Sequence, residues 1–194
     1  MIIVDTELSG LEVDKHSIVS IGAIDFENPE RQFYKECRIF EGAHIMDEAL
    51  SVNGFTRDQI TDPTKPSDGE IVKEFLEWVS QSKEQTLAGQ NVSFDHDFLK
   101  AAAQCYHLNW LIAKRTLDLH SICYFHMSKH SIEIPHTHEH SALNLDAVVS
   151  YCGFKIQRSK HNALEDAKIE AECFHRLFFD KPFFQDFKDD PVPW

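Results

Sequence analysis

Two acidic residues near the start of the chain are the first that could do chemistry. Asp5 and Glu7 stand two positions apart, and the apolar run around Ile2–Thr6 predicts a buried strand. Residues two apart in a strand point to the same face, so the two carboxylates should project side by side. Unpaired charge in a core strand is costly, and a divalent cation that prefers oxygen ligands is a natural counter-charge. The alternative is two acids meeting by chance at a strand end.

A third acid, Asp95, comes shortly after a short strand that ends at Gly89. It is expected to begin a helix that continues to His107, with Phe94 anchoring the turn before it. A structural alternative is that Asp95 caps this helix, as Asp commonly does. Asp97, two residues on, is the acid that competes for the same role.

The fourth acid and a histidine come late in the chain. His161 and Asp166 are five positions apart, about 140° round an ideal helix, so they share no face if both are helical. They converge if Asn162 caps the helix and His161 lies in the loop before it. Asn162 and Glu165 have the spacing of a capping box, which gives Glu165 a structural role. A lone surface histidine is the alternative for His161.

The elements that must position these residues alternate between strand and helix. Three early strands with short links predict an antiparallel meander, and helical periodicity then takes over. The expected strands are Ile2–Thr6, Ile18–Phe26, Phe33–Phe40, Thr86–Ala88 and Arg115–Leu119, and the expected helices are a stretch that begins after Ser67, Asp95–His107, Ser121–Met127, Leu143–Cys152 and Asn162–Phe179. This order predicts an α/β fold with a mixed sheet flanked by helices. Residues 128–140 are expected to form a long histidine-rich surface loop.

Length and composition are typical of one globular domain. The chain has 194 residues, 42% of them hydrophobic, and we expect a domain over residues 1–180 with an aromatic and acidic tail, 181–194, that packs on the body or faces a partner. No apolar run is long enough to cross a bilayer, and the core strand at the start leaves no room for a leader, so we expect a cytoplasmic protein. Five scattered cysteines without a CxxC pair agree with this.

The three acidic motifs together resemble one enzyme family. Asp5-Thr6-Glu7, Phe94-Asp95 and the His161–Asp166 pair stand in the order and spacing of the DnaQ-like, or DEDDh, 3′–5′ exonucleases. The likeness extends over nearly the whole chain, although the family often has His-Asn where this chain has Gln90-Asn91. It implies a ribonuclease H-like fold with a five-stranded mixed sheet.

The resemblance also implies a mechanism and a ligand set. Asp5, Glu7, Asp95 and Asp166 would hold two divalent cations, Mg²⁺ or Mn²⁺, and His161 would act as the general base. The products would be nucleoside 5′-monophosphates from the 3′ end of a nucleic acid, with single-stranded DNA favoured.

Side chains beside the motifs are expected to contact this substrate. The resemblance places Leu8 and Leu11 against the terminal base, through apolar contact that is indifferent to base identity. The residues expected to bind substrate are Thr6, Leu8, Leu11, Asn91, Phe94, Lys155, Arg158 and Lys160.

The charge of the chain raises an objection to a polyanionic partner. Its formal net charge is −13, whereas nucleic-acid binders are usually basic. Metal binding neutralises part of the acidic cluster, and the basic residues are not evenly spread. Lys155, Arg158 and Lys160 lie between Asp146 and Glu165, an interval without another acid, and lead directly into His161. We expect these three to contact phosphates, with a solvated basic loop as the alternative.

Three other readings of the sequence stay open. The same chemistry could act on RNA or short oligoribonucleotides, because the residues that recognise a 2′-hydroxyl lie outside the motifs. A non-catalytic subunit that binds nucleic acid or a polymerase would have lost an acidic ligand, and none is missing here. Finally, the histidines His126, His130, His136, His138 and His140 could form a transition-metal site instead of a solvated loop. No polymerase partner or oligomeric state follows from the sequence.

Overall fold

A five-stranded mixed sheet forms the centre of the molecule. The computed structural model describes residues 1–156 and 160–194. The strand order is β3-β2-β1-β4-β5: the first three strands pair antiparallel, β4 pairs in parallel with β1, and β5 pairs in parallel with β4. The strands are β1 (Ile2–Leu8), β2 (Ile18–Asp25), β3 (Gln32–Glu36), β4 (Leu87–Gly89) and β5 (Leu117–Asp118). This confirms the expected mixed sheet, with the acidic strand in its middle.

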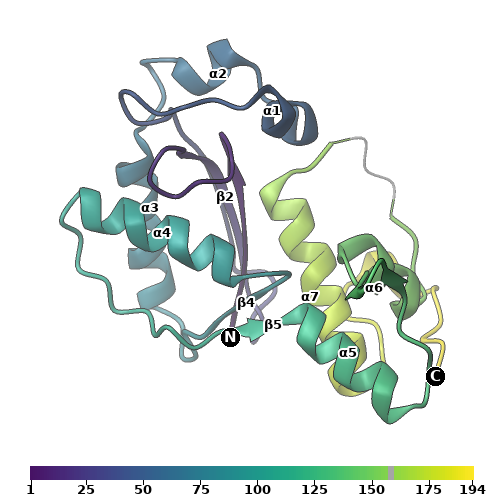
Figure 1. The fold of residues 1–194 in the computed structure, drawn as a ribbon. Helices are drawn as coiled ribbons and strands as arrows, with labels where there is room; N and C mark the ends of the chain where they lie inside the picture. The colour runs from purple at the N-terminus through teal and green to yellow at the C-terminus, as the bar shows by residue number, and fades with distance from the viewer. Residues whose placement is uncertain (157–159) are drawn as a thin grey trace.

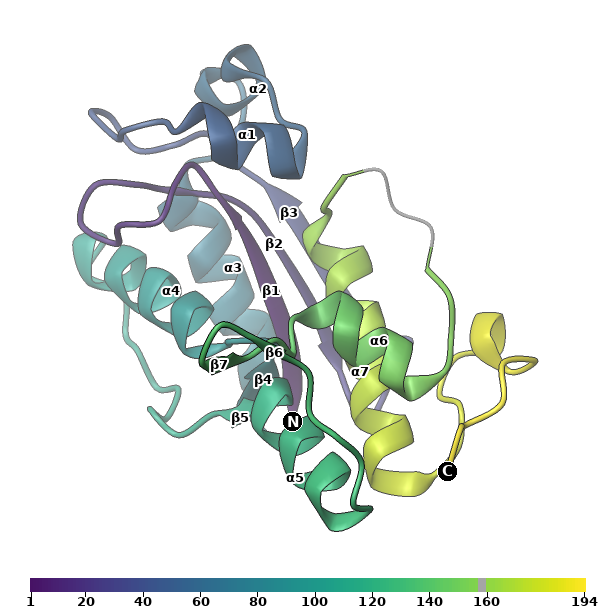
Figure 2. The same cartoon turned by 45° about the vertical axis from the view of Figure 1, so that its right-hand side comes forward.

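Helices cover both faces of the sheet (Figure 1). Helices α3 and α4 lie on one face, and α7, α5 and α6 lie on the other, while α1 and α2 lie beyond the end at which β1 finishes (Figure 2). The helices are α1 (Asp47–Asn53), α2 (Arg57–Thr61), α3 (Asp68–Ser80), α4 (Ser93–Cys105), α5 (Leu119–Lys129), α6 (Leu145–Cys152), α7 (Ala163–Phe179) and the 3-10 helix η1 (Gln185–Phe187). None in the described chain is long and apolar enough to cross a membrane.

Alternation along β1 divides the interior into two cores. Ile3 packs in a cluster with side chains of α5, α6 and α7, whereas Ile2 and Val4 pack with side chains of α3 and α4. Because successive strand residues point to opposite faces, Asp5 and Glu7 share the α7 face with Ile3. The acidic pair of β1 is therefore directed at the helix that carries the last motif.

Helix α7 approaches the sheet closely because β2 contains a glycine. A Cβ atom on Gly22 would lie 2.1 Å from the carbonyl carbon of Ala163, the first residue of α7. Any larger residue at this position would push the start of the helix away from the sheet. Gly22 thus sets how near the last motif comes to the acids of β1.

Several element boundaries differ from the sequence expectations. Strand β3 ends at Glu36 instead of Phe40, since the chain then leaves the sheet and Arg38 forms a single bridge with Ser67. Helices α1 and α2 were not expected. The expected loop at residues 128–140 instead holds the end of α5 and the start of a hairpin, whose strands are β6 (His136–Thr137) and β7 (His140–Ser141).

The C-terminal segment lies against α6 and α7. A buried pair on α7, Glu172 and Arg176, is joined at 2.6 Å, and Arg176 also donates to the backbone carbonyl of Phe187 at 2.9 Å. The ring of Trp194 stacks on that of Tyr151 with centroids 5.0 Å apart. Backbone and ring contacts together hold this segment to the two helices.

Candidate active site

The two acids of β1 lie at the meeting point of five carboxyl groups. Glu7 is buried and Asp5 is partly exposed. Burial raises the pKa of Asp5 well above its ordinary value, and the charges of Asp95, Glu170, Glu7 and Asp166 raise it further. The metal-free protein therefore resists ionising all of these groups at once.

Asp95 is held in the site by the strand that carries the first motif. The backbone N–H and the hydroxyl of Thr6 both donate to Asp95 Oδ1, at 2.9 and 2.7 Å. Burial raises the pKa of Asp95 to about 7, although the two hydrogen bonds from Thr6 act in the opposite direction. Thr6 points away from the acids of β1, and its bonds bring the start of α4 to the site.

Asp95 does not begin its helix, contrary to the sequence expectation. Helix α4 starts at Ser93, and Val92 occupies the capping position without a side-chain hydrogen bond. Asp95 thus lies in the first turn, where the helix dipole favours a negative charge. The competing acid Asp97 points to solvent, with a side chain that is 64% exposed. Burial thus separates the two acids, which the sequence left in competition.

His161 lies outside α7 and reaches Asp166 from the preceding loop. The distance from His161 Nδ1 to Asp166 Oδ2 is 3.0 Å, and the His161 side chain is 43% exposed. The backbone N–H of His161 donates to the carbonyl of Val52 in α1 at 3.1 Å, which fixes the loop. Ligand atoms of Glu7, His161 and Asp166 all lie within 4.8 Å of one another.

The capping box expected at the start of α7 forms on one side only. Asn162 Oδ1 accepts the backbone N–H groups of Leu164 and Glu165, each at 3.2 Å. The Glu165 side chain instead forms an ion pair with Lys168 at 2.8 Å on the helix surface. Asn162 alone provides the cap, and the capping role expected for Glu165 is wrong.

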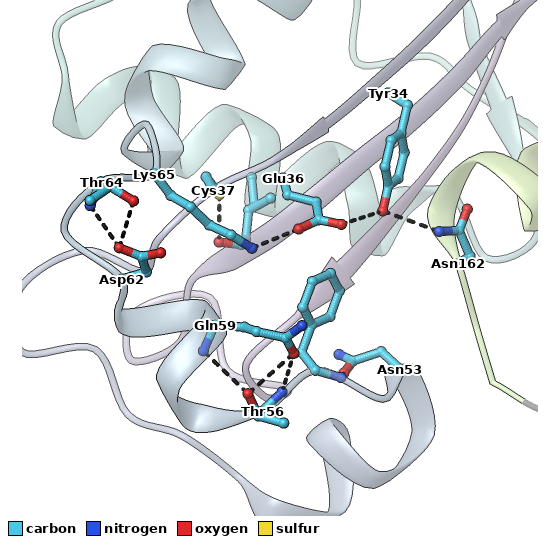
Figure 3. A network of polar contacts seen from close by, with 12 residues as sticks. Tyr34, Glu36, Cys37, Asn53, Thr56, Gln59, Asp62, Thr64, Lys65 and Asn162 are labelled. Carbon is cyan, nitrogen blue, oxygen red and sulfur yellow. Dashed lines mark hydrogen bonds and ion pairs between the residues drawn. The ribbon is translucent and has the colours of Figure 1, made fainter.

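A polar network ties this cap to the edge of the sheet (Figure 3). The Asn162 amide donates to Tyr34 Oη at 3.1 Å, and that hydroxyl donates to Glu36 Oε1 at 3.0 Å. Lys65 Nζ lies 2.6 Å from the other Glu36 oxygen. Burial and the neighbouring Glu36 raise the pKa of Tyr34 to about 12, so the hydroxyl stays protonated and can make both bonds. The residue after His161 is thereby anchored to β3.

The residues expected to bind substrate lie at several places around this site. Leu8 is buried at an irregularity in the β1–β2 pairing, whereas Leu11 is 64% exposed. Phe94 packs on Phe98 with ring centroids 5.1 Å apart, and the exposed Asn91 adopts a φ of 55° in the turn before α4.

The basic residues before His161 are only partly described. Lys155 is exposed, and Lys160 Nζ lies 3.4 Å from the carbonyl oxygen of Gly54. Arg158 lies outside the described residues. A cavity of about 280 Å³ beside His161 is lined in part by Lys160, Asn53 and Tyr34.

The family can now be identified from a comparison with known proteins. The RNase_T family model, described as an exonuclease, matches residues 2–174, from β1 into α7. The chain belongs to this exonuclease family. All three acidic motifs lie within the matched residues, and the exonuclease family expected from the sequence is confirmed.

Relatives of this exonuclease domain include both independent nucleases and parts of polymerases. The 3′–5′ DNA exonuclease Cap18 of Escherichia coli is 28% identical over 180 residues, covering 90% of this chain and 89% of that protein. DNA polymerase III subunit epsilon of Treponema pallidum is 31% identical over 97 residues, covering 50% of this chain and 43% of the subunit. DNA polymerase III PolC-type of Thermotoga maritima is 24% identical over 185 residues, covering 91% of this chain and 12% of the polymerase. The chain thus spans less than half of either polymerase relative.

Solved structures share the fold of this exonuclease domain. The nuclease domain of 3′hExo, a DEDDh family member bound to rAMP, has a TM-score of 0.69 at 18% identity and covers 100% of this chain and 95% of its own. Escherichia coli Exonuclease I in complex with a dT13 oligonucleotide has a TM-score of 0.68 at 13% identity. The match covers 90% of this chain and 40% of Exonuclease I. These similarities confirm the ribonuclease H-like fold.

The donor groups at the site fit hard divalent cations. Asp5, Glu7, Asp95 and Asp166 offer oxygen atoms, and Mg²⁺ and Mn²⁺ prefer such ligands. Glu7, His161 and Asp166 form the one group within the described residues whose ligand atoms are close enough to hold an ion together. Cations would also offset the repulsion that raises the pKa of Asp5.

The histidine cluster does not bring three possible metal ligands together within the described residues. His126 Nδ1 lies 2.7 Å from the Tyr151 hydroxyl, and the rings of His126 and His130 stack with centroids 4.4 Å apart. His136 and His140 lie in the β6–β7 hairpin, which is a separate element. The described ligand groups include none of them.

Three polar residues around the site were not foreseen from the sequence. Glu170 and Gln90 hydrogen-bond to each other beside the acids, and Tyr34 holds the cap of α7. Glu170 follows Asp166 by four positions and so shares its helix face. This spacing is the one local signal in the sequence that could have placed Glu170 at the site. The sequence showed Gln90 only as a departure from the family pattern, and Tyr34 carries no such signal, since the contacts of both join distant parts of the chain.

Proposed function

We propose that this chain is a 3′–5′ exonuclease that hydrolyses phosphodiester bonds and releases nucleoside 5′-monophosphates. The observation that carries the proposal is the convergence of Glu7, His161 and Asp166 within 4.8 Å, from opposite ends of the sequence. Asp5 and Asp95 lie close to this group, since the charges of Asp95, Glu7 and Asp166 all raise the pKa of Asp5. These are the five positions at which the family motifs stand.

In this proposal the four carboxylates hold two divalent cations, Mg²⁺ or Mn²⁺. Asp5 would bridge the two ions, Glu7 and Asp166 would complete one, and Asp95 would hold the other. Bound cations would supply charge stabilisation for the attacking and leaving oxygens and lower the pKa of a water molecule. Thr6 supports the role of Asp95, because two hydrogen bonds to Oδ1 leave Oδ2 available to a ligand.

His161 is proposed as the general base that takes a proton from the attacking water. Its Nδ1 faces Asp166 at 3.0 Å, which orients the ring and leaves Nε2 to accept the proton. The side chain is 43% exposed, so solvent reaches it. The proximity of His161 to two carboxylates also makes it a possible ligand, and metal binding by a His161→Ala variant separates the two roles.

Single-stranded DNA is the substrate that we favour. The relative that covers nine tenths of both chains is named a 3′–5′ DNA exonuclease. RNA is the second candidate, because a solved structure with this fold concerns 3′-end specific recognition of histone mRNA stem-loop by a 3′-exonuclease. Thr6, Leu8, Leu11, Asn91 and Phe94 are proposed to contact the terminal nucleotide in either case.

The test offers end-labelled single-stranded DNA, duplex DNA and RNA side by side, with Mg²⁺ and with Mn²⁺. Asp5→Ala, Glu7→Ala, Asp95→Ala and Asp166→Ala should each nearly abolish hydrolysis while circular dichroism stays unchanged. Asp97→Ala is the matched control and should keep activity, because its side chain points to solvent. Full activity of Asp95→Ala would contradict the assignment, and an inactive wild-type chain that binds nucleic acid would favour a non-catalytic subunit.

A further inference from the structure

Glu170 is a fifth acidic residue beside the candidate metal ligands. It lies in α7 one turn after Asp166, on the same face of the helix, and is only 1% exposed. Burial raises the pKa of Glu170 well above its ordinary value, and the charges of Asp95, Asp166 and Asp118 raise it further. The five-carboxyl site described above therefore includes a member with no role in the proposed chemistry.

The Glu170 carboxyl packs on the turn that connects β4 to α4. Its Oε1 accepts the backbone N–H of Gln90 at 3.0 Å, and a Cβ atom added to Gly89 would lie 3.0 Å from its Oε2. The Gln90 side chain donates to the Leu143 carbonyl at 2.8 Å, which also fixes the turn. Asn91 follows in a left-handed conformation, and α4 with Asp95 begins immediately afterwards. Glu170 thus contacts the segment that aims Asp95.

Burying a carboxyl group at position 170 costs folding free energy, so we look for a role that offsets this cost. Neighbouring acids and burial both disfavour its charge, and Oε2 has no hydrogen-bond partner within the described part of the chain. An apolar side chain of similar size would fill the same space without that cost. What it could not do is accept the N–H of Gln90.

We propose that Glu170 is a positioning residue for Asp95. Its bond to Gln90 links the turn before α4 directly to α7, one helical turn from Asp166, and so sets the separation between the second and third motifs. Thr6 holds the Asp95 side chain from β1, and Glu170 holds the backbone of its turn from α7. This inference rests on the proposed metal site, because Asp95 and Asp166 matter together as ligands.

The test compares Glu170→Gln with Glu170→Leu and Glu170→Met in the full chain. Glutamine keeps an oxygen that can accept the Gln90 N–H, whereas leucine and methionine keep the volume and lose the acceptor. Isothermal calorimetry with Mn²⁺ should give about tenfold weaker binding for the two apolar variants and little change for glutamine, since removing a group that orients a ligand usually costs this much affinity. Melting temperatures in EDTA should be unchanged or higher in the apolar variants. Hydrogen exchange at the Gln90 amide should accelerate in them but not in glutamine.

Glu172→Gln is the matched control on the same helix. Glu172 is also fully buried, but it pairs with Arg176 on the side facing the C-terminal segment. This variant should lower the melting temperature and leave Mn²⁺ affinity unchanged, which separates loss of fold from loss of position.

Four results would overturn the inference, three of them on the variants and one on the wild type. Wild-type Mn²⁺ affinity in the leucine and methionine variants would show that Asp95 needs no such support. If Glu170→Gln bound Mn²⁺ as weakly as the leucine and methionine variants, the carboxylate of Glu170 would itself bind an ion. Affinity and melting temperature that fall together would indicate a purely structural role. A wild-type chain that binds no Mn²⁺ at all would remove the proposed metal site, and the inference with it, and this outcome is distinct from the other three.

Discussion

The pKa of Asp95 predicts how the stability of the metal-free protein changes with pH. Burial raises this pKa from 3.8 to about 7, against the hydrogen bonds from Thr6. Between these two values the folded protein keeps a proton that the unfolded chain has already released. The contribution of Asp95 to stability is therefore largest below the lower pKa and is lost as the pH rises through 7.

The size of this effect follows from the width of the window. Each pKa unit corresponds to about 1.4 kcal/mol, and the interval from pH 5 to pH 8 includes about two units in which only the unfolded chain is ionised. The free energy of unfolding should therefore fall by roughly 3 kcal/mol through Asp95 alone. The raised pKa values of Asp5 and Glu170 act in the same direction.

Urea unfolding in EDTA at pH 5 and pH 8 measures this loss in the wild type and in Asp95→Asn. Asparagine stays neutral and can still accept both hydrogen bonds from Thr6, so the variant should lose roughly 3 kcal/mol less than the wild type across the interval. Asp97→Asn, at the exposed position, should behave as the wild type. Saturating Mn²⁺ at pH 8 should stabilise Asp95→Asn less than the wild type, because the variant keeps only the ligands proposed for the other ion. Equal losses in the wild type and Asp95→Asn would refute the reasoning.

Three further predictions concern the base, the cap of α7 and the basic run. His161→Ala should lower the rate by about 10²–10⁴ with unchanged Mn²⁺ affinity, measured by single-turnover kinetics and calorimetry. Tyr34→Phe leaves a polar partner unpaired and should lower the free energy of unfolding by about 1–3 kcal/mol in urea titrations. Replacing Lys155, Arg158 and Lys160 by Gln should weaken binding of all long strands and flatten the log–log salt dependence by roughly 0.7 per lost phosphate contact. An unchanged salt slope would place the phosphate contacts elsewhere.

The order and spacing of the acidic motifs carried the family resemblance, and each motif also combines a residue type with a local element. Strand alternation placed Asp5 and Glu7 on one face, and a helix start placed His161 outside α7. Such signals depend on neighbours within a few positions. The mixed sheet and the helices that carry the motifs follow from the same local patterns, whereas the five-stranded ribonuclease H-like fold was implied by the family resemblance.

Local patterns gave less information where tertiary contacts determine which residues enter the site. The sequence left Asp95 and Asp97 in competition, and it is the hydrogen bonds from Thr6, 89 positions earlier, that bring Asp95 into the site. Helices α1 and α2 have 7 and 5 residues, too short for a clear apolar period. The role of Glu170 depends on a turn 80 positions away, which no local pattern describes.

The topology also sets the order in which the site can form during synthesis. Asp5 and Glu7 are made before the other motifs, and Asp166 follows Asp5 by 161 positions. At roughly 5–20 residues per second, about ten to thirty seconds separate the two. Until α7 leaves the ribosome, the acidic face of β1 has neither its helical partner nor, in the proposed mechanism, its base. In the proposed mechanism, a site with this connectivity stays incomplete until α7 has been made and has packed on the sheet.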